Sequence, residues 1–176
     1  MTIIQPSGSD AEGRAVLVRS DEAEVLGDAD TPAAIRLLAD ASATGGALST
    51  QRITLARGAD GATPHHHTGS SELFFVIEGS VQILSGTEVV TAHQGDLAVV
   101  PPRMAHAFAA PPGSTCDLLI VITPGVERFE YFRLLARLRA GEATVEELLA
   151  AQERFDNHFV DSPSWRAARE GSGSVG

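Results

Sequence analysis

The sequence has 176 residues, which is enough for one ordinary domain or for a barrel with an appendage, but not for two barrels. Its 43% hydrophobic and 20% charged residues are typical of a chain that folds around a core of its own. The net charge of −10 opposes binding to nucleic acid and to anionic membranes, so we expect a small-molecule partner instead.

Two residue counts exclude whole classes of chemistry. All 13 basic residues are arginine, so enzymes that form a Schiff base on lysine and phosphate-binding loops that need a lysine are excluded. Cys116 is the only cysteine, which excludes an internal disulfide and a zinc site made of paired thiolates, and its apolar surroundings favour a packing role. We see no secretion signal and no run of eighteen apolar residues, and expect a cytoplasmic protein.

The chain divides into four parts. Residues 1–14 and 169–176 are rich in small and polar residues, so we expect flexible ends. Residues 15–124 contain short apolar or alternating runs separated by Gly, Pro, Asp and Thr, a pattern that predicts an antiparallel β sandwich or barrel. The predicted strands are 14–19, 33–38, 47–56, 72–78, 80–85, 87–92, 96–101, 106–110 and 116–123. Residues 56–64, between two of them, have the composition of a turn.

One of these segments has two interpretations. Residues 33–41 could form a helix, with Thr31 as its N-cap and Pro32 at its first position. They could also form a strand, and we favour the strand because the neighbouring runs are strands.

After Pro124 the pattern becomes helical and predicts an extension over residues 125–168. Val126, Phe129 and Leu135 follow helical spacing, and Gly141 supplies a stop. Thr144 and the glutamate three residues later then form the capping box of a second helix. We expect this pair of helices to cover the open end or edge of the sheet.

The stretch PHHHTGSSELFFVIEG, residues 64–79, carries the most informative side chains. In an extended segment His65 and His67 point to the same face, while His66 points away. Glu72 opens the next strand. Two imidazoles and one carboxylate suit iron, manganese, nickel, cobalt or zinc with open coordination positions, so we expect one divalent transition metal ion.

A second stretch, GDLAVVPPRMAHAF, brings a further imidazole. His106 begins a strand eleven residues after Gly95. If that strand lies beside the first, His106 joins His65, His67 and Glu72 at one point. Such a site leaves one or two positions for water, oxygen or a chelating substrate.

These two stretches resemble the motifs of the cupin superfamily. Its first motif is matched by His65, His67, Glu72 and Gly79, with Gly58 one residue further upstream than in the pattern. Its second motif is matched by Gly95, Pro101 and His106, whereas Arg103 replaces a glycine and Ala110 an asparagine. The resemblance implies an all-β fold, a small antiparallel jelly-roll barrel.

The C-terminal extension resembles a subgroup of that superfamily. Residues 123–136 and 153–159 are similar to the tails of single-domain cupins related to quercetin 2,3-dioxygenase. This resemblance implies a metal-dependent dioxygenase that cleaves a flavonol-like ring with loss of carbon monoxide.

Strand parity also predicts the substrate pocket. Phe74 and Val76 share the face of Glu72, and Phe108 shares that of His106, so we expect these three residues to line an apolar pocket around the metal. Whether Arg103, Tyr131 or the C-terminal helices contact the substrate stays open.

Three functions are compatible with these residues. The first is a dioxygenase acting on a small enolic or phenolic substrate, with the metal as Lewis acid and Glu72 as ligand and base. The second is a non-oxidative cyclase, isomerase or decarboxylase of a natural-product pathway. The third is a cupin that binds a small molecule without catalysis. Because edge strands of small barrels pair readily, we also expect a homodimer.

Overall fold

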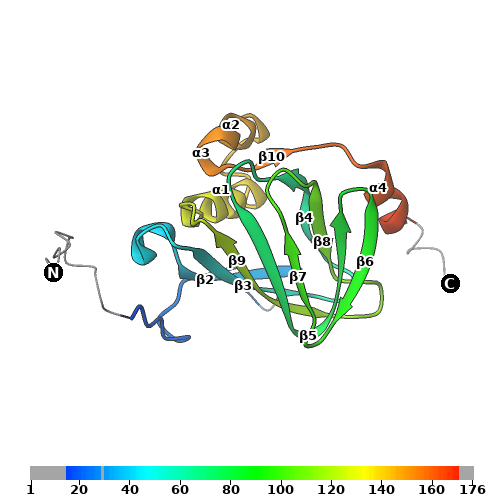
Figure 1. Ribbon diagram of the computed structural model, residues 1–176, viewed down its shortest axis with the longest axis horizontal. Helices are drawn as coiled ribbons and strands as arrows, with labels where there is room; N and C mark the ends of the chain where they lie inside the picture. The colour runs from blue at the N-terminus through cyan, green and yellow to red at the C-terminus, as the bar shows by residue number, and fades with distance from the viewer. Residues whose placement is uncertain (1–14, 29, 171–176) are drawn as a thin grey trace, which may run out of the picture.

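The fold is an open, curled half-barrel of antiparallel strands with helices around it (Figure 1). The computed structural model describes residues 15–28 and 30–170, so the predicted flexible segment 1–14 lies outside the described residues. The strands are β1 (Val25–Leu26), β2 (Ala33–Ala39), β3 (Ser49–Leu55), β4 (Asp60–His66), β5 (Ser71–Ser85), β6 (Glu88–His93), β7 (Leu97–Val100), β8 (His106–Ala109), β9 (Cys116–Thr123) and β10 (His158–Phe159).

All strand pairs in the described part of the chain are antiparallel. The hydrogen-bonded order is β1-β2-β3-β9-β5-β8-β4-β10, and β6 and β7 also pair with β5. This confirms the all-β antiparallel prediction. The inner face of the curl is where the buried side chains of the strands meet.

Strand β5 holds the half-barrel together because it belongs to both halves of it. Its first part, Ser71–Gly79, pairs with β9, and its second part, Ser80–Ser85, pairs with β6. Gly79 stands at the change, with φ of +75°, and a Cβ there would lie 2.1 Å from the carbonyl oxygen of Thr115. The glycine of the first motif is therefore needed for the bend.

The strand interpretation of residues 33–38 is confirmed, since β2 alternates buried and half-buried side chains along its length. Ile35 of β2 faces Ile53 of β3 across the pair. The strand predicted at 14–19 is wrong over its described part. Val16 and Leu17 are 52% and 70% exposed, and no neighbouring strand pairs with them, so their apolar character finds no partner.

The segment interpreted as a turn at 56–64 is a turn only in its first part. Strand β4 begins at Asp60 and pairs with β8 through two register irregularities. Gly61 allows this close approach, because a Cβ there would lie 2.3 Å from the Phe108 ring. The glycines that signalled a turn thus serve a strand that runs tightly under an aromatic side chain.

The helices are η1 (Ala41–Thr44), α1 (Phe129–Arg139), α2 (Val145–Ala150), α3 (Gln152–Phe155) and α4 (Pro163–Glu170). The carboxylate of Asp40, at the end of β2, accepts hydrogen bonds from the backbone N–H groups of Arg128 and Phe129 at 2.7 and 3.1 Å. It therefore caps α1 from the sheet. The capping box predicted at Thr144 and Glu147 is present at the start of α2.

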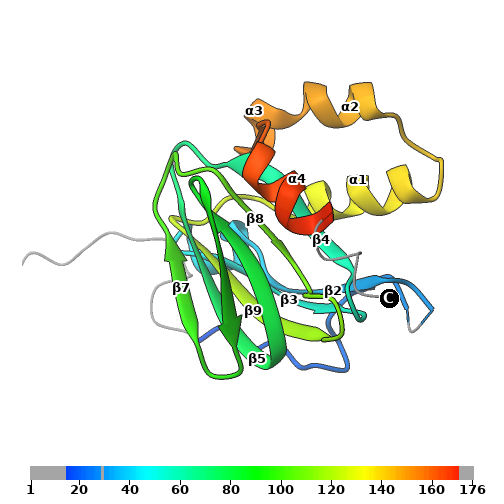
Figure 2. The same ribbon diagram turned by 90° about the vertical axis from the view of Figure 1, so that its right-hand side faces the viewer.

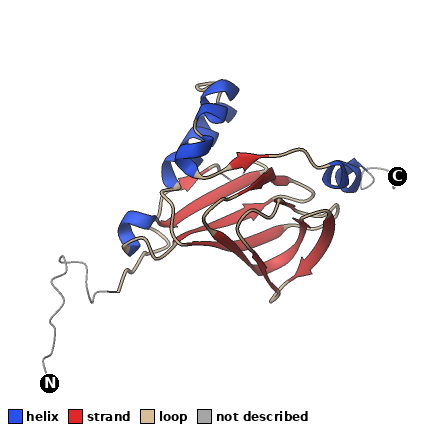
Figure 3. Ribbon diagram, turned by 45° about the horizontal axis from the view of Figure 1, so that its top comes forward, coloured by secondary structure: helices blue, strands red, loops and turns tan. Residues whose placement is uncertain are grey.

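The second predicted helix, over residues 145–155, is divided into α2 and α3, and α4 lies beyond the predicted pair. Figure 2, compared with Figure 1, shows α1, α2 and α3 together and α4 apart from them beside β6, and Figure 3 shows β10 and the loop after it connecting α3 to α4. The Arg169 guanidinium donates to Asp60, Gln82 and the carbonyl oxygens of Ala110 and Gly58, so the ordered extension continues past residue 168. No helix within the described ranges is long and apolar enough to span a bilayer.

Candidate metal centre

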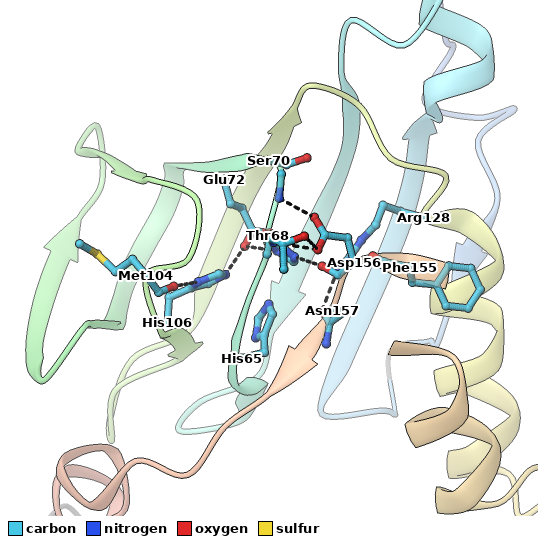
Figure 4. A network of polar contacts seen from close by, with 12 residues as sticks. His65, Thr68, Ser70, Glu72, Met104, His106, Arg128, Phe155, Asp156 and Asn157 are labelled. Carbon is cyan, nitrogen blue, oxygen red and sulfur yellow. Dashed lines mark hydrogen bonds and ion pairs between the residues drawn. The ribbon is translucent and has the colours of Figure 1, made fainter. Parts of the chain in front are cut away.

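Three imidazoles and one carboxylate meet inside the curl, from strands that are far apart in the sequence. The antiparallel pairing of β4 and β8 places His65 directly opposite His106. His67 follows β4, and Glu72 lies near the start of β5. The potential ligand atoms of these four residues lie within 4.8 Å of one another, and all four side chains are buried. Figure 4 shows His65, Glu72 and His106 of this cluster.

Each of the three histidines is held by a backbone carbonyl oxygen. The Nδ1 atoms of His65, His67 and His106 lie 2.8, 2.5 and 2.9 Å from the carbonyl oxygens of Thr63, Asp156 and Met104. Because a carbonyl oxygen can only accept, Nδ1 carries the proton in each ring. The Nε2 atom of each ring therefore faces the cluster, where it binds a metal ion through its lone pair or, when protonated, donates to the carboxylate of Glu72.

Glu72 is ionised among these imidazoles. Burial alone raises the pKa of a carboxyl group, but hydrogen bonds and charge from His106 and His67 hold the pKa of Glu72 well below its usual range. Its Oε2 lies 2.7 Å from His106 Nε2 and 3.3 Å from His67 Nε2. Burial also depresses the pKa of His65 well below its usual value, which keeps that imidazole neutral.

The donor set fits a divalent transition metal ion. Ligand bonds of about 2.0–2.3 Å put two ligand atoms on one ion at most about 4.6 Å apart, close to the spread of 4.8 Å in this cluster. Small side-chain shifts would close the cluster on an ion. The cluster could therefore hold a metal, although the donor types do not decide which.

The C-terminal extension contributes to this centre through Asp156, which ends α3 in a left-handed conformation with φ of +47°. Its carbonyl oxygen accepts a hydrogen bond from His67 Nδ1. Its carboxylate accepts hydrogen bonds from the backbone and hydroxyl of Thr68 and from the backbone of Gly69. Burial raises the pKa of Asp156, but these hydrogen bonds lower it by more, so its net pKa is below the usual value. The carboxylate is therefore ionised and fixes the turn after His67.

A cavity of about 260 Å³ adjoins the cluster, between the inner face of the sheet and α1. His65 and Glu72 form part of its wall. Most of the remaining wall is apolar and comes from β2, β3, α1 and α2: Ile35, Ile53, Leu55, Leu135, Leu138 and Leu148. The helices of the extension thus close the cavity, as the sequence predicted in outline.

Of the three residues predicted to line the pocket, the structure places only Phe108 at the cavity wall. Phe74 and Val76 point inward as parity predicted, but they are fully buried in the packed core. Phe74 lies against the rings of Phe108 and His106, at centroid distances of 5.5 and 6.3 Å. It therefore supports the cavity wall from behind.

Several polar residues of the cavity were not predicted from the sequence. Gln51 comes from β3, Arg128 and Tyr131 from the start of α1, and Asn157 from the link between α3 and β10. None belongs to a motif, and each reaches the cavity through tertiary packing. The one available signal was the charged residue at the start of a helix predicted to cover the barrel.

The side chains that the sequence left aside are not part of the cluster. His66 stacks on His158, with ring centroids 5.2 Å apart, and His93 contacts the Ser80 hydroxyl. Cys116 is buried in the core, which agrees with a packing role. Arg103 is exposed and has φ of +68°, a left-handed conformation that explains why the motif has glycine there.

Comparison with known families agrees with this geometry. The family described as cupin domain matches residues 51–122, a range that contains all four residues of the cluster. Among curated proteins, no relative matches the chain. The resemblance of residues 123–159 to quercetin 2,3-dioxygenases is not among these findings and stays a prediction.

Solved structures share the cupin fold. A predicted oxalate decarboxylase from Thermotoga maritima is 19% identical with a TM-score of 0.54, covering 61% of this chain and 98% of that one. A Streptomyces PAC13 variant with uridine is 13% identical with a TM-score of 0.53, covering 87% and 98%. The polyketide cyclase RemF from Streptomyces resistomycificus is 18% identical with a TM-score of 0.51, covering 71% and 97%. At these identities the likeness establishes the fold.

Proposed function

We propose that this protein is a metal-dependent enzyme that activates a small, largely apolar substrate by removing a proton from an enol or phenol. One observation carries the proposal: among the described residues, Glu72 is the only carboxylate that lines the cavity, and it belongs to the histidine cluster. The base and the metal ligands therefore face the same space.

The residues divide the work as follows. His65, His67, His106 and Glu72 would hold one divalent transition metal ion of unknown identity. Such an ion acts as a Lewis acid that lowers the pKa of a bound hydroxyl group. Glu72, ionised at neutral pH, accepts the proton of that hydroxyl. The apolar wall excludes water and holds the body of the substrate.

Our first candidate for the fate of the deprotonated substrate is dioxygenation. Dioxygen would add both of its atoms to the electron-rich enolate, as in the ring cleavage of flavonol-like molecules. The apolar cavity supports this candidate, because it suits both an aromatic substrate and dioxygen, and so does the resemblance of the C-terminal extension.

The second candidate is a non-oxidative reaction, such as a cyclisation, dehydration, isomerisation or decarboxylation. These reactions need a proton donor as well as a base. Burial raises the pKa of Tyr131, so its phenol in the cavity wall stays protonated at neutral pH and can donate. The names of fold neighbours, a polyketide cyclase and a nucleoside dehydratase, are in line with this candidate.

The test combines metal analysis with turnover. We expect the full chain, prepared without an affinity tag, to contain one divalent metal and to consume oxygen with at least one member of a panel of flavonols and smaller enols and phenols. Activity should be lost on metal removal and in Glu72→Gln. It should persist in Glu78→Gln, which removes the same charge from an exposed position of the same strand.

The outcomes separate the candidates. Product formed equally under argon would exclude dioxygenation and support the second candidate. Stabilisation by ligand with no product from flavonols, related enols or diketones would favour a binding protein over an enzyme. Protein that takes up no divalent metal would contradict the proposal as a whole.

The homodimer stays a prediction. The outer face of β5 and β7 carries exposed apolar side chains, with Phe75 opposite Leu97 in the strand pair, at 39% and 58% exposure. Such a face is compatible with self-association. Light scattering coupled to size-exclusion chromatography would give the oligomeric state directly. A monomer at all protein concentrations would contradict the prediction.

A further inference from the structure

Arg128 is a buried cation without a counter-ion. The residue is only 3% exposed. No carboxylate of residues 15–28 and 30–170 forms an ion pair with its guanidinium. One terminal nitrogen donates to the Phe155 carbonyl oxygen at 3.0 Å and the other to Asn157 Oδ1 at 3.3 Å. Its Nε is buried and has no hydrogen-bond partner among the described residues.

This arrangement differs from that of the ion-paired arginines, such as those at positions 52, 133, 166 and 169, which pair with Asp or Glu nearer the surface. Burying a cation without an opposite charge is unfavourable. The rings of Tyr131 and Phe132, 4.6 and 5.5 Å from the guanidinium carbon, offset only part of that cost. A buried guanidinium that lowers the stability of the free protein indicates that a bound ligand supplies the opposite charge.

Asn157 provides a second, independent sign at the same place. The residue is 1% exposed, and its Oδ1 faces the guanidinium of Arg128. Its Nδ2 is therefore turned away from that partner, and it is buried without a hydrogen bond among the described residues. Arg128 and Asn157 thus both hold unused donors, and both line the cavity (Figure 4).

Glu72 cannot serve as the missing counter-ion. Its Oε2 is engaged by the Nε2 atoms of His106 and His67, so its charge is already matched inside the cluster. The cavity wall therefore contains two chemically distinct polar groups, the cluster and the Arg128–Asn157 pair, in addition to the exposed Arg139.

We infer that the cavity binds a small organic carboxylate, whose two oxygens accept hydrogen bonds from the guanidinium of Arg128 and the amide of Asn157. A carboxylate matches the planar donors of a guanidinium. The apolar wall would hold its body. Because about 260 Å³ is below the 300–1,000 Å³ of sites for drug-sized ligands, that body is about one ring in size.

This inference rests on the proposed function for the cavity being a substrate site, but its test does not need the metal. The probe is trans-cinnamate, compared by calorimetric titration with its neutral isostere cinnamamide, on the full chain as purified and after removal of metal. We expect the acid to bind about tenfold or more tightly than the amide in both preparations.

Two variants locate the preference. Arg128→Met should abolish it, whereas Arg137→Met, which removes the same charge from an exposed position on α1, should preserve it. Asn157→Asp guards against a loss of folding, because its carboxylate would pair with Arg128 and keep or raise the unfolding temperature. We expect it to weaken cinnamate binding about tenfold and leave cinnamamide unchanged.

The opposing results are distinct. Equal affinity for acid and amide, no measurable binding of the acid, or wild-type cinnamate binding by Asn157→Asp overturns the inference. A preference that disappears when metal is removed overturns it as well, since the carboxylate is then bound by the cluster, and this leaves the proposed function intact. A chain that takes up no metal yet prefers cinnamate contradicts the proposed function and supports the inference.

Discussion

The Nδ1 atom of His67 lies 2.5 Å from the backbone carbonyl oxygen of Asp156, 89 residues further along the chain. This contact joins the stretch that matches the cupin domain family to the helical extension at the candidate metal centre. The orientation of one potential ligand is therefore set by residues outside residues 51–122. The extension takes part in building the centre as well as in covering the cavity.

The first prediction tests that contact. Asp156→Gly keeps the left-handed conformation but removes the carboxylate that fixes Thr68 and Gly69, so the turn after His67 should loosen. We expect the affinity for Zn²⁺ or Co²⁺ to fall about 10-fold to 100-fold, measured by competition with a chelating dye. Asp161→Gly, at an exposed position, should leave the affinity unchanged. Wild-type affinity in Asp156→Gly would show that the carboxylate does not position the ligand.

The second prediction concerns pH and the single tyrosine. Burial raises the pKa of Tyr131, an effect that the nearby Arg128 partly opposes. The neutral phenol thus contributes stability that is complete below about pH 10 and is lost as the pH rises through the higher pKa of the folded state. Ultraviolet titration of tyrosinate should give a midpoint above 10 in the native protein and near 10 in urea. A native midpoint at or below 10 contradicts the assignment, and Tyr131→Phe should show no transition.

The third prediction concerns Arg103, which occupies a left-handed conformation with φ of +68°. Glycine adopts this conformation without steric cost, so Arg103→Gly should stabilise the protein by about 1 kcal/mol in urea denaturation. Arg103→Ala removes the same guanidinium but keeps the Cβ, and we expect no gain from it. An equal gain in both variants would mean that the arginine head group, and not the backbone, was unfavourable.

The fourth prediction concerns the attachment of α4. Trp165, the only tryptophan, packs on Leu84, Ala107 and Ala109, and Arg169 fastens the same helix to the sheet. We expect Arg169→Ala to cost about 1–3 kcal/mol and to shift the tryptophan emission to longer wavelength. Arg166→Ala, whose side chain pairs only with Asp161 in the described chain, is the control. Unchanged emission in Arg169→Ala would show that the apolar contacts hold α4 alone.

Features that depend on local sequence were predictable. Alternation identified most strands, and the spacing of His65 and His67 placed both on one face of a strand. The meeting with His106 followed only from the resemblance and from pairing of β4 with β8, which the structure has. The capping box at Thr144 was likewise readable, because both of its partners lie within one turn.

Features that depend on packing between distant segments were missed. Parity turned Phe74 and Val76 inward, but it does not tell a core side chain from a cavity wall, because both face the inside of the curl. Arg128 and Asn157 reach the cavity from the extension, whose path over the sheet has no local signal. Helix α4 did have a local signal, because Ser162 followed by Pro163 is typical of a helix start. In the structure, Ser162 Oγ accepts a hydrogen bond from the backbone N–H of Trp165.

Because the ribosome makes residue 156 after all four potential ligands, the contact between His67 and Asp156 can form only after the ligands have been made. Three of the four potential ligands emerge together, the fourth follows with β8, and the carbonyl group that orients His67 emerges last, with the end of α3. A nascent polypeptide stalled before residue 156 can form the strands but not the finished coordination sphere. The metal centre can therefore be completed only after α3 has been made.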